Sequence, residues 1–344
     1  MSTLKNCVTN GIPSQVFKKY LDLYKTIGFM QKTIDFLDEK YPVYMDLTKK
    51  DDIFNFYKAF FSDSKLKDSR INQFIEKKTG DYTRNKDEIV LKNIVYIFDL
   101  INLGTKLNID IEEFRNLSNQ FLKGTKEVNR FKKNLKNQES YIDRLNRICA
   151  EYNNAIKNED IELIYAACSL LVDFTYLKPF EYYNEEIGII MFYAILKSAD
   201  IKSFKYYSFF KALYENKEMY NQSLFMSYHL IDQNLNNCFE LLKYMLNICI
   251  SSYDEISNIE NNISYDKQLK KNETVEAVIY KLPVNFSKSD IMAKLPSVSM
   301  TTIDRCLKRL SEEGKITSWG KGRNAKWVRI DKTHDDAINF LDNE

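Results

Sequence analysis

The feature that most constrains this chain is the stretch at 161–200, which predicts two helices joined by a polar elbow at 178–185. Both helices are apolar on nearly every face, and such helices lie inside a protein or a membrane. Each apolar run is shorter than the ~20 residues that a membrane span needs, and charged residues interrupt both runs. We therefore expect the stretch to form the buried centre of a helical domain that has no membrane partner.

Length and composition narrow the class further. A chain of 344 residues can hold two domains with a substantial core, and the lack of an apolar signal segment favours a cytoplasmic location. The six cysteines occur singly, which argues against a zinc site or a disulfide framework. The only histidines are His229 and His334, and no glycine-rich phosphate loop occurs, so histidine chemistry and the common nucleotide enzymes are disfavoured. We expect no metal ion and no cofactor.

The spacing of apolar residues divides the chain. Helical spacing continues through 1–255, which predicts an all-α bundle, and 256–271 loses this spacing and predicts a polar linker. In 272–330, short helical segments bounded by Pro283, Pro296 and Gly314 are followed by two strand-like runs. This segment has eleven Lys and Arg against six Asp and Glu, whereas 331–344 is an acidic tail. Its basic character predicts a polyanion partner for this segment alone.

The elements predicted for 272–330 are helix, strand, helix, turn, helix and hairpin, an order that resembles a winged helix-turn-helix. In the third helix, Met300, Ile303, Leu307 and Leu310 form an apolar stripe. The candidates for DNA contact lie elsewhere on this helix and at the hairpin tip: Thr301, Thr302, Arg305, Lys308, Arg309, Lys321 and Arg323.

Three carboxylates and two tryptophans complicate this prediction. Asp304, Glu312 and Glu313 dilute the basic face and favour a protein-docking role for the same small domain. Trp319 and Trp327 fall in the hairpin strands, where core packing is the simpler expectation.

The elbow itself runs Lys178-Pro179-Phe180-Glu181-Tyr182-Tyr183-Asn184-Glu185-Glu186-Ile187-Gly188-Ile189. It resembles a degenerate version of the Fic family motif, HPFx(D/E)GNGRxxR. Pro179, Phe180 and Asn184 match in register, and Gly188 stands where many members have a glycine. The flanking apolar helices, a segment at 69–72 similar to the family's autoinhibitory helix and the C-terminal winged helix agree with the family's layout over most of 60–330. The resemblance implies a Fic-like helical bundle.

The departures from the motif fall on the positions of its chemistry. The resemblance implies that Lys178 stands in place of the histidine that acts as base, and Tyr182 in place of the acidic ligand of Mg²⁺. A lysine with its ordinary pKa of ~10.4 is protonated and is a poor base unless it is deeply desolvated.

The phosphate-binding positions are also replaced. The resemblance implies that Tyr183 and Glu185 stand in place of two glycines whose backbone N–H groups cradle the phosphates, and that Glu186 and Ile189 stand in place of two arginines. Carboxylates at the start of a helix suit the helix dipole, but they occupy an anion site and repel a triphosphate. Asn72 stands in place of the autoinhibitory glutamate. We therefore predict no catalytic residue in the elbow.

Three functions are compatible with these residues. The favoured one is a catalytically degenerate Fic-fold regulator that binds DNA through 272–330. The second is a divergent enzyme that transfers AMP to a protein hydroxyl, and only this one requires ATP and Mg²⁺. The third is a helical protein-interaction module without DNA binding, whose partner is another protein or a second copy of the chain. The chain is therefore expected not to be an enzyme, with the transferase as the alternative.

Overall fold

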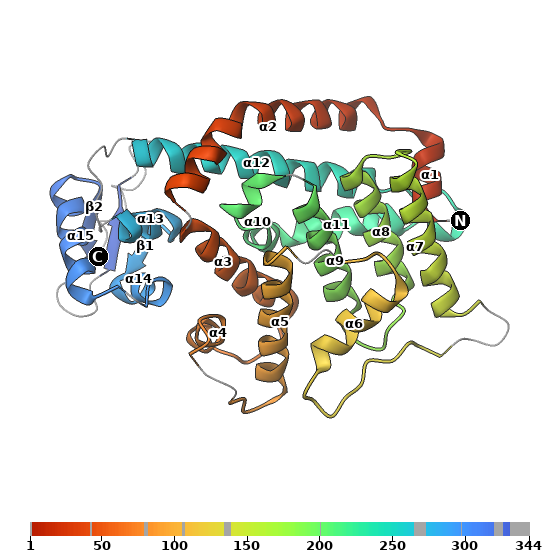
Figure 1. The fold of residues 1–344 in the computed structure, drawn as a ribbon, viewed down its shortest axis with the longest axis horizontal. Helices are drawn as coiled ribbons and strands as arrows, with labels where there is room; N and C mark the ends of the chain where they lie inside the picture. Colours follow the sequence, from red (N-terminus) through yellow and green to blue (C-terminus); the bar gives the residue numbers. More distant parts are fainter. Residues whose placement is uncertain are drawn as a thin grey trace, which may run out of the picture. The chain divides into compact units, whose positions relative to one another are not determined.

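The computed structural model describes residues 2–41, 43–78, 82–104, 107–133, 139–199, 201–264, 273–296, 298–319 and 326–330. The chain forms two compact units, Met1–Asn258 and Ile259–Glu344. The first is helical, and the second combines helices with a small three-stranded sheet (Figure 1). This arrangement confirms the predicted fold class of a helical bundle followed by a small α+β domain. Within the described ranges, none of the helices has the length and apolar character to cross a membrane.

The helices of the first unit are α1 (Thr3–Asn10), α2 (Ser14–Lys40), α3 (Val43–Phe60), α4 (Asp68–Ile75), α5 (Lys86–Asn102), α6 (Ile111–Leu122), α7 (Tyr141–Lys157), α8 (Leu163–Leu177), α9 (Asn184–Ser198), η1 (Lys202–Lys205), α10 (Phe209–Glu215), α11 (Lys217–Tyr228), η2 (Ile231–Gln233) and α12 (Phe239–Ser264). Residues 256–264 continue α12, where a linker was expected, because no glycine or proline stops the helix and Ile256 is buried. The rest of the predicted linker lies outside the described residues.

The centre of this unit is α8 with α9, as the apolar stretch predicts. The helix α8 packs against α1, α7, α9 and α11, and nearly all its side chains are buried (Figure 1). Gly188 of α9 allows the two helices to approach closely. A Cβ atom at this position would lie 3.0 Å from Cδ1 of Phe174 and 3.2 Å from Cδ1 of Leu171.

The second unit contains α13 (Glu273–Lys281), β1 (Asn285–Ser287), α14 (Lys288–Lys294), α15 (Met300–Glu312), β2 (Ile316–Trp319) and β3 (Lys326–Arg329). The strands are antiparallel in the order β1-β3-β2, with Trp327 of β3 opposite Phe286 and Ser318. The side chains of Ser287 and Ser299 cap α14 and α15, and serine is a favoured residue at the N-cap of a helix. The acidic tail at 331–344 and the tip at 320–325, with Lys321 and Arg323, lie outside the described residues.

Candidate functional site: the elbow between α8 and α9

Two left-handed residues shape the elbow. Lys178 ends α8 with φ 45° and ψ 61°, and Tyr183 precedes α9 with φ 57° and ψ 31°. This conformation costs a non-glycine residue about 1 kcal/mol, so neighbouring contacts must hold it. Lys178 is exposed, and its side chain is therefore not in the desolvated setting that a lysine base requires.

The amide of Asn184 closes the elbow on itself. Its Oδ1 accepts a hydrogen bond from the backbone N of Phe180 at 2.9 Å, and its Nδ2 donates to the backbone O of Phe180 at 2.8 Å. Both polar atoms of this side chain are therefore engaged in hydrogen bonds within the loop. Under the transferase alternative, the replaced glycines and arginines of the motif leave Asn184 to hold the phosphates nearly alone. The hydrogen bonds to Phe180 leave its amide group poorly placed for that role.

An extended segment before α7 braces the elbow from outside. Backbone hydrogen bonds join Lys132 N to Pro179 O at 2.8 Å and Glu181 N to Arg130 O at 3.0 Å, and the rings of Phe131 and Phe180 lie 4.5 Å apart. These bonds form an isolated antiparallel bridge between Phe131 and Phe180. Residues 125–137 are rich in Lys and Asn, a composition typical of a solvated loop, so the sequence gives no sign of this contact.

Asn129 is the most informative residue of this segment. It is only 4% exposed, its Nδ2 donates to the backbone O of Tyr182 at 2.8 Å, and its Oδ1 accepts from the backbone N of Tyr182 at 2.9 Å. The amide pairs with one residue of the elbow as a neighbouring strand would. Nothing in the sequence distinguishes Asn129 from the other asparagines of the run, because its partner lies 53 positions away.

The two tyrosines of the elbow have different surroundings. The ring of Tyr183 stacks on Phe121 at 5.3 Å between centroids and lies 5.8 Å from Phe61. Tyr182 remains 45% exposed, with Lys86 Nζ 5.8 Å from the centre of its ring. Tyr183 thus fills the space that a glycine at its position would leave open, whereas Tyr182 lies at the surface.

Two carboxylates and one lysine surround the start of α9. The Nζ of Lys217 lies 2.8 Å from Oε1 of Glu185 and 3.5 Å above the centre of the Phe60 ring. Burial lowers the pKa of Lys217, with Glu185 opposing this shift. Burial raises the pKa of Glu186 to about 7, and the charge of Glu185 adds to the rise. The start of this helix therefore carries acidic groups in place of an open anion site.

The remaining motif positions have structural surroundings as well. Ile189 is fully buried in the core. Asn72 lies on α4, where the neighbouring Arg70 holds Glu88 through two hydrogen bonds of 2.7 and 3.0 Å. Across the described residues, no group of three or more His, Cys, Asp and Glu is placed to hold a metal ion.

The second candidate surface is the outer face of α15. Thr301 and Arg305 are exposed, and the side chain of Lys308 is 80% exposed. Asp304 lies on the same face and pairs with Lys288 at 2.7 Å, and Glu312 lies 3.8 Å from Lys308. This face therefore offers cations to a partner, but carboxylates accompany them.

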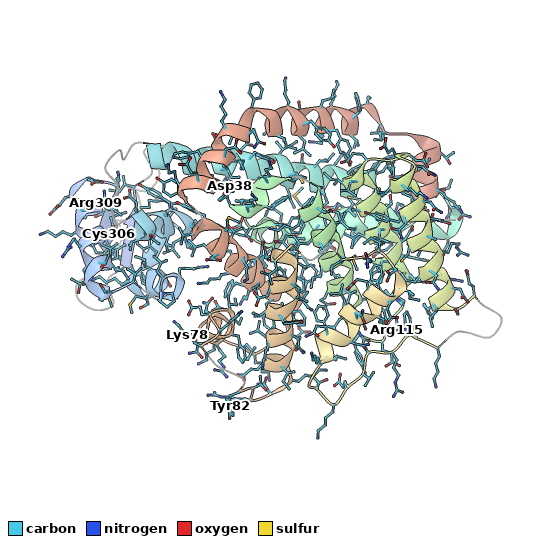
Figure 2. All side chains as sticks on the ribbon, in the orientation of Figure 1. Asp38, Lys78, Tyr82, Arg115, Cys306 and Arg309 are labelled. Atoms are coloured by element: carbon cyan, nitrogen blue, oxygen red, sulfur yellow. The ribbon has the colours of Figure 1, made fainter. Side chains whose placement is uncertain are left out.

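Two predicted DNA contacts on α15 have partners within their own domain. Arg309 pairs with the buried Glu276 of α13 and, at 2.9 Å, with Glu313 (Figure 2). Thr302 is part of the N-terminal cap of α15: its backbone N donates a hydrogen bond to Ser299 Oγ at 3.2 Å, and its own Oγ1 lies 2.9 Å from the same oxygen. We therefore remove Arg309 from the proposed DNA-contacting face, because it holds α15 against α13.

Two expectations for the apolar residues of this domain were wrong. Trp319 is 62% exposed because it lies on β2, the edge strand next to the hairpin tip, whereas Trp327 on the central strand is half-buried. Met300, expected in the buried stripe, is exposed in the first turn of α15. Ile303, Leu307 and Leu310 are buried as predicted.

Comparisons with known proteins agree with the fold. No protein-family model and no curated protein matches the sequence. Among solved structures, the chain is similar to a Fic family protein from Desulfovibrio desulfuricans G20, with a TM-score of 0.52 and 13% identity over 94% of this chain and 98% of that chain. At this identity the likeness shows the fold alone. The fold is therefore Fic-like, as the elbow predicts. The similarity covers 94% of the chain and so extends over more residues than the helical unit contains.

Proposed function

We propose that this chain is a catalytically silent Fic-fold protein whose small domain, acting as a winged helix-turn-helix, binds duplex DNA. The observation that carries the first half is the elbow at the start of α9. Asn184 is bonded to Phe180, Tyr183 is packed against Phe121, and Glu185 and Glu186 stand where phosphates would lie under the Fic resemblance. Each of these contacts works against nucleotide binding.

Electrostatics supports the same conclusion. A carboxylate and a phosphate oxygen ~4 Å apart repel by about 1 kcal/mol in water and by about 4 kcal/mol near a protein surface. Lys217 compensates the charge of Glu185, and Glu186 adds a second negative charge above pH 7. A triphosphate at this helix start would therefore meet repulsion where binding needs donors and cations.

Calorimetry with ATP and Mg²⁺ tests the silent elbow. We expect no saturable heat at millimolar nucleotide, and no labelling of the protein by radioactive ATP. The variant Glu186→Arg should also remain inactive, because Lys178, Tyr182 and Tyr183 still replace the base, the metal ligand and a glycine that the family resemblance implies. Labelling of the wild-type chain at its own hydroxyl groups would contradict this half of the proposal.

The DNA half rests on the exposed face of α15. A helix of this kind fits the major groove, where arginine pairs with guanine and threonine contacts either base edges or thymine methyl groups. Thr301, Arg305 and Lys308 are exposed on this face, and 272–330 carries more cations than carboxylates. Because part of the charge on α15 is balanced by Asp304 and Glu312, we expect modest affinity with a strong salt dependence.

Fluorescence anisotropy with labelled duplexes and the full chain tests DNA binding. Arg305→Ala and Lys308→Ala should each weaken binding about tenfold, and loss of a phosphate contact should reduce the slope of log K against log salt by about 1. Lys157→Ala removes an exposed charge from α7 and serves as the matched control. No retention of any duplex at 50 mM salt would contradict this half.

A protein partner is the second candidate for the small domain. The observation that favours it is Trp319, which lies exposed on an edge strand, because exposed aromatic residues are common anchors in protein interfaces. Under this alternative, Trp319→Ala abolishes capture of the partner while Arg305→Ala has little effect. The DNA proposal predicts the reverse order for duplex binding.

A further inference from the structure

The first unit contains a cavity of about 1000 Å³ that is separate from the elbow. It lies among residues of α3, α5, α7, α9 and η1 and of the segments that follow α5 and α9. Ala194 to Ser198 of α9 line it, whereas the elbow lies at Asn184, so the two sites are about 20 Å apart at 1.5 Å per residue. Nothing in the proposed function uses this cavity.

The cavity has an apolar wall. Its main apolar contributors are Met45, Ile101, Ile109, Ile156, Ile195 and Phe204. A volume of this size is at the upper end for small-molecule pockets, which hold about 300–1000 Å³ and are mostly apolar with a few placed polar groups. The wall could therefore cover the apolar body of a ligand and not merely a hydrated ion.

The charged residues in the described part of the cavity lining are all lysines. The described lining residues include Lys49, Lys197, Lys202 and Lys205, and none of them is an aspartate or a glutamate. Carboxylates outside the lining also lie near these lysines. Lys49 lies 2.5 Å from Asp99 and Lys205 lies 3.0 Å from Asp38, which Figure 2 labels, and the charge of Asp38 also interacts with Lys202. The positive charge of the described lining residues therefore favours an anionic ligand.

Lys197 is the most informative of these lysines. Its Nζ donates to the backbone O of Phe204 at 3.3 Å and lies 5.6 Å from the ring centre of Tyr193. The neighbouring acid, Asp52, is buried and accepts hydrogen bonds from Tyr193 Oη and Ser208 Oγ, both at 2.7 Å. Burial lowers the pKa of Lys197, which shows that its charge is incompletely solvated. The charge of Asp52 opposes this shift, and a bound anion in the cavity would oppose it further.

We propose that this cavity binds a small organic anion that has an apolar body, with its carboxylate or phosphate group beside Lys197 and Lys202. An inorganic anion would leave the apolar wall in water, and a neutral apolar molecule would give the lysines of the wall no charged partner inside the cavity. A ligand with an apolar body and an anionic group would cover the apolar wall and pair with the lysines at the same time. The site is the cavity at the C-terminal end of α9, away from the start of α9.

Calorimetry with four probes of one chain length tests the proposal on the full protein. Octanoate and octyl phosphate carry the two anionic head groups, and 1-octanol and octylammonium carry a neutral and a cationic one. We expect saturable binding of at least one anion, and binding at least tenfold weaker for the alcohol and the cation. The anion that binds more tightly identifies the head group. Equal binding of all four probes, or no saturable binding of either anion, would overturn the proposal.

Substitutions locate the binding site. Lys197→Met and Lys202→Met each keep a long side chain and remove one charge, and we expect each to weaken binding of the anion about tenfold, the effect of losing one charge-assisted contact. Lys157→Met on α7 lies next to the lining residue Ile156 but is itself exposed, so it should leave binding unchanged. Unchanged binding in both Lys197→Met and Lys202→Met, with melting temperatures like that of the wild type, would also overturn the proposal.

Discussion

Replacing Glu186 by glutamine should stabilise the protein at alkaline pH and have little effect at acidic pH. Burial, with a smaller contribution from Glu185, raises the pKa of Glu186 from its ordinary 4.5 to about 7. The unfolded chain therefore releases this proton near pH 4.5, and the folded chain releases it near pH 7. Between these values the folded state binds more protons, so stability falls as the pH rises.

The size of the effect follows from the shift. A change of one unit in pKa corresponds to about 1.4 kcal/mol, so the shift of Glu186 to about 7 corresponds to about 3 kcal/mol as an upper value. The full cost is present above pH 7 and absent below pH 4.5. Glutamine keeps the shape of the side chain without ionising, so it removes this cost. In a unit of this size, 3 kcal/mol corresponds to a rise in Tm of roughly 6–12 °C.

Far-UV circular dichroism of the full chain is the assay, because the helical bundle dominates that signal. We expect Glu186→Gln to melt higher than the wild type at pH 8 and within about 1–2 °C of it at pH 4.5. The buried Asp52 and Asp173 also have raised pKa values, of about 6 and about 7, but both proteins contain them, so their contributions cancel.

Glu185→Gln is the matched control, since it removes the adjacent carboxylate from the same helical turn. Glu185 pairs with Lys217, so its loss should leave stability unchanged or lower at pH 8. A Tm of Glu186→Gln that stays equal to that of the wild type from pH 4.5 to pH 8 would show that Glu186 is ordinarily solvated. The electrostatic argument about the elbow would then be wrong.

Three further substitutions test the packing. Asn129→Ala should cost about 1–2 kcal/mol and speed hydrogen exchange at Tyr182, because it removes both hydrogen bonds to that backbone. Gly188→Ala should cost about 1–3 kcal/mol in the far-UV melt, because its Cβ would press on Phe174. Arg309→Met should lower the melting temperature of the small domain, followed by tryptophan fluorescence since both tryptophans lie there, whereas Arg305→Ala should not.

The long-range organisation of the fold was predictable because burial leaves a strong mark on sequence. The helices α8 and α9 are apolar all round, and they form the centre of the bundle. Helix caps are predictable from the local sequence, because a serine directly before a helical segment favours a helix start, as Ser287 and Ser299 show. The end of α12 was not predictable, because tertiary burial there overrides local signals. Asp52 shows the same effect, since aspartate favours helix starts but this one is buried within α3.

The site was predictable in position but not in its contacts. The motif resemblance located the elbow, but Lys217 and Asn129 come from other parts of the chain and carry no mark in the sequence. The same limit applies to the small domain. Helical periodicity assigned Arg309 to the outer face, whereas the buried Glu276, 33 positions away, draws it toward α13. Pairings between distant polar residues are set by the fold and cannot be predicted from the spacing of residues along the sequence.

The residues that match the Fic motif are those that shape the elbow. Phe180 is fully buried and Pro179 accepts the hydrogen bond from Lys132, while Asn184 ties the loop together and Gly188 admits Phe174. These contacts hold the turn between α8 and α9 without involving a nucleotide.

The residues that depart from the motif have acquired contacts of their own. Tyr183 packs on Phe121, and Glu185 pairs with Lys217. Building a phosphate site at the elbow would therefore require breaking a packed aromatic pair and an ion pair as well as inserting an arginine. For this reason we expect no single substitution to recover transfer, and we expect the elbow to keep its shape in variants that remove only its charges.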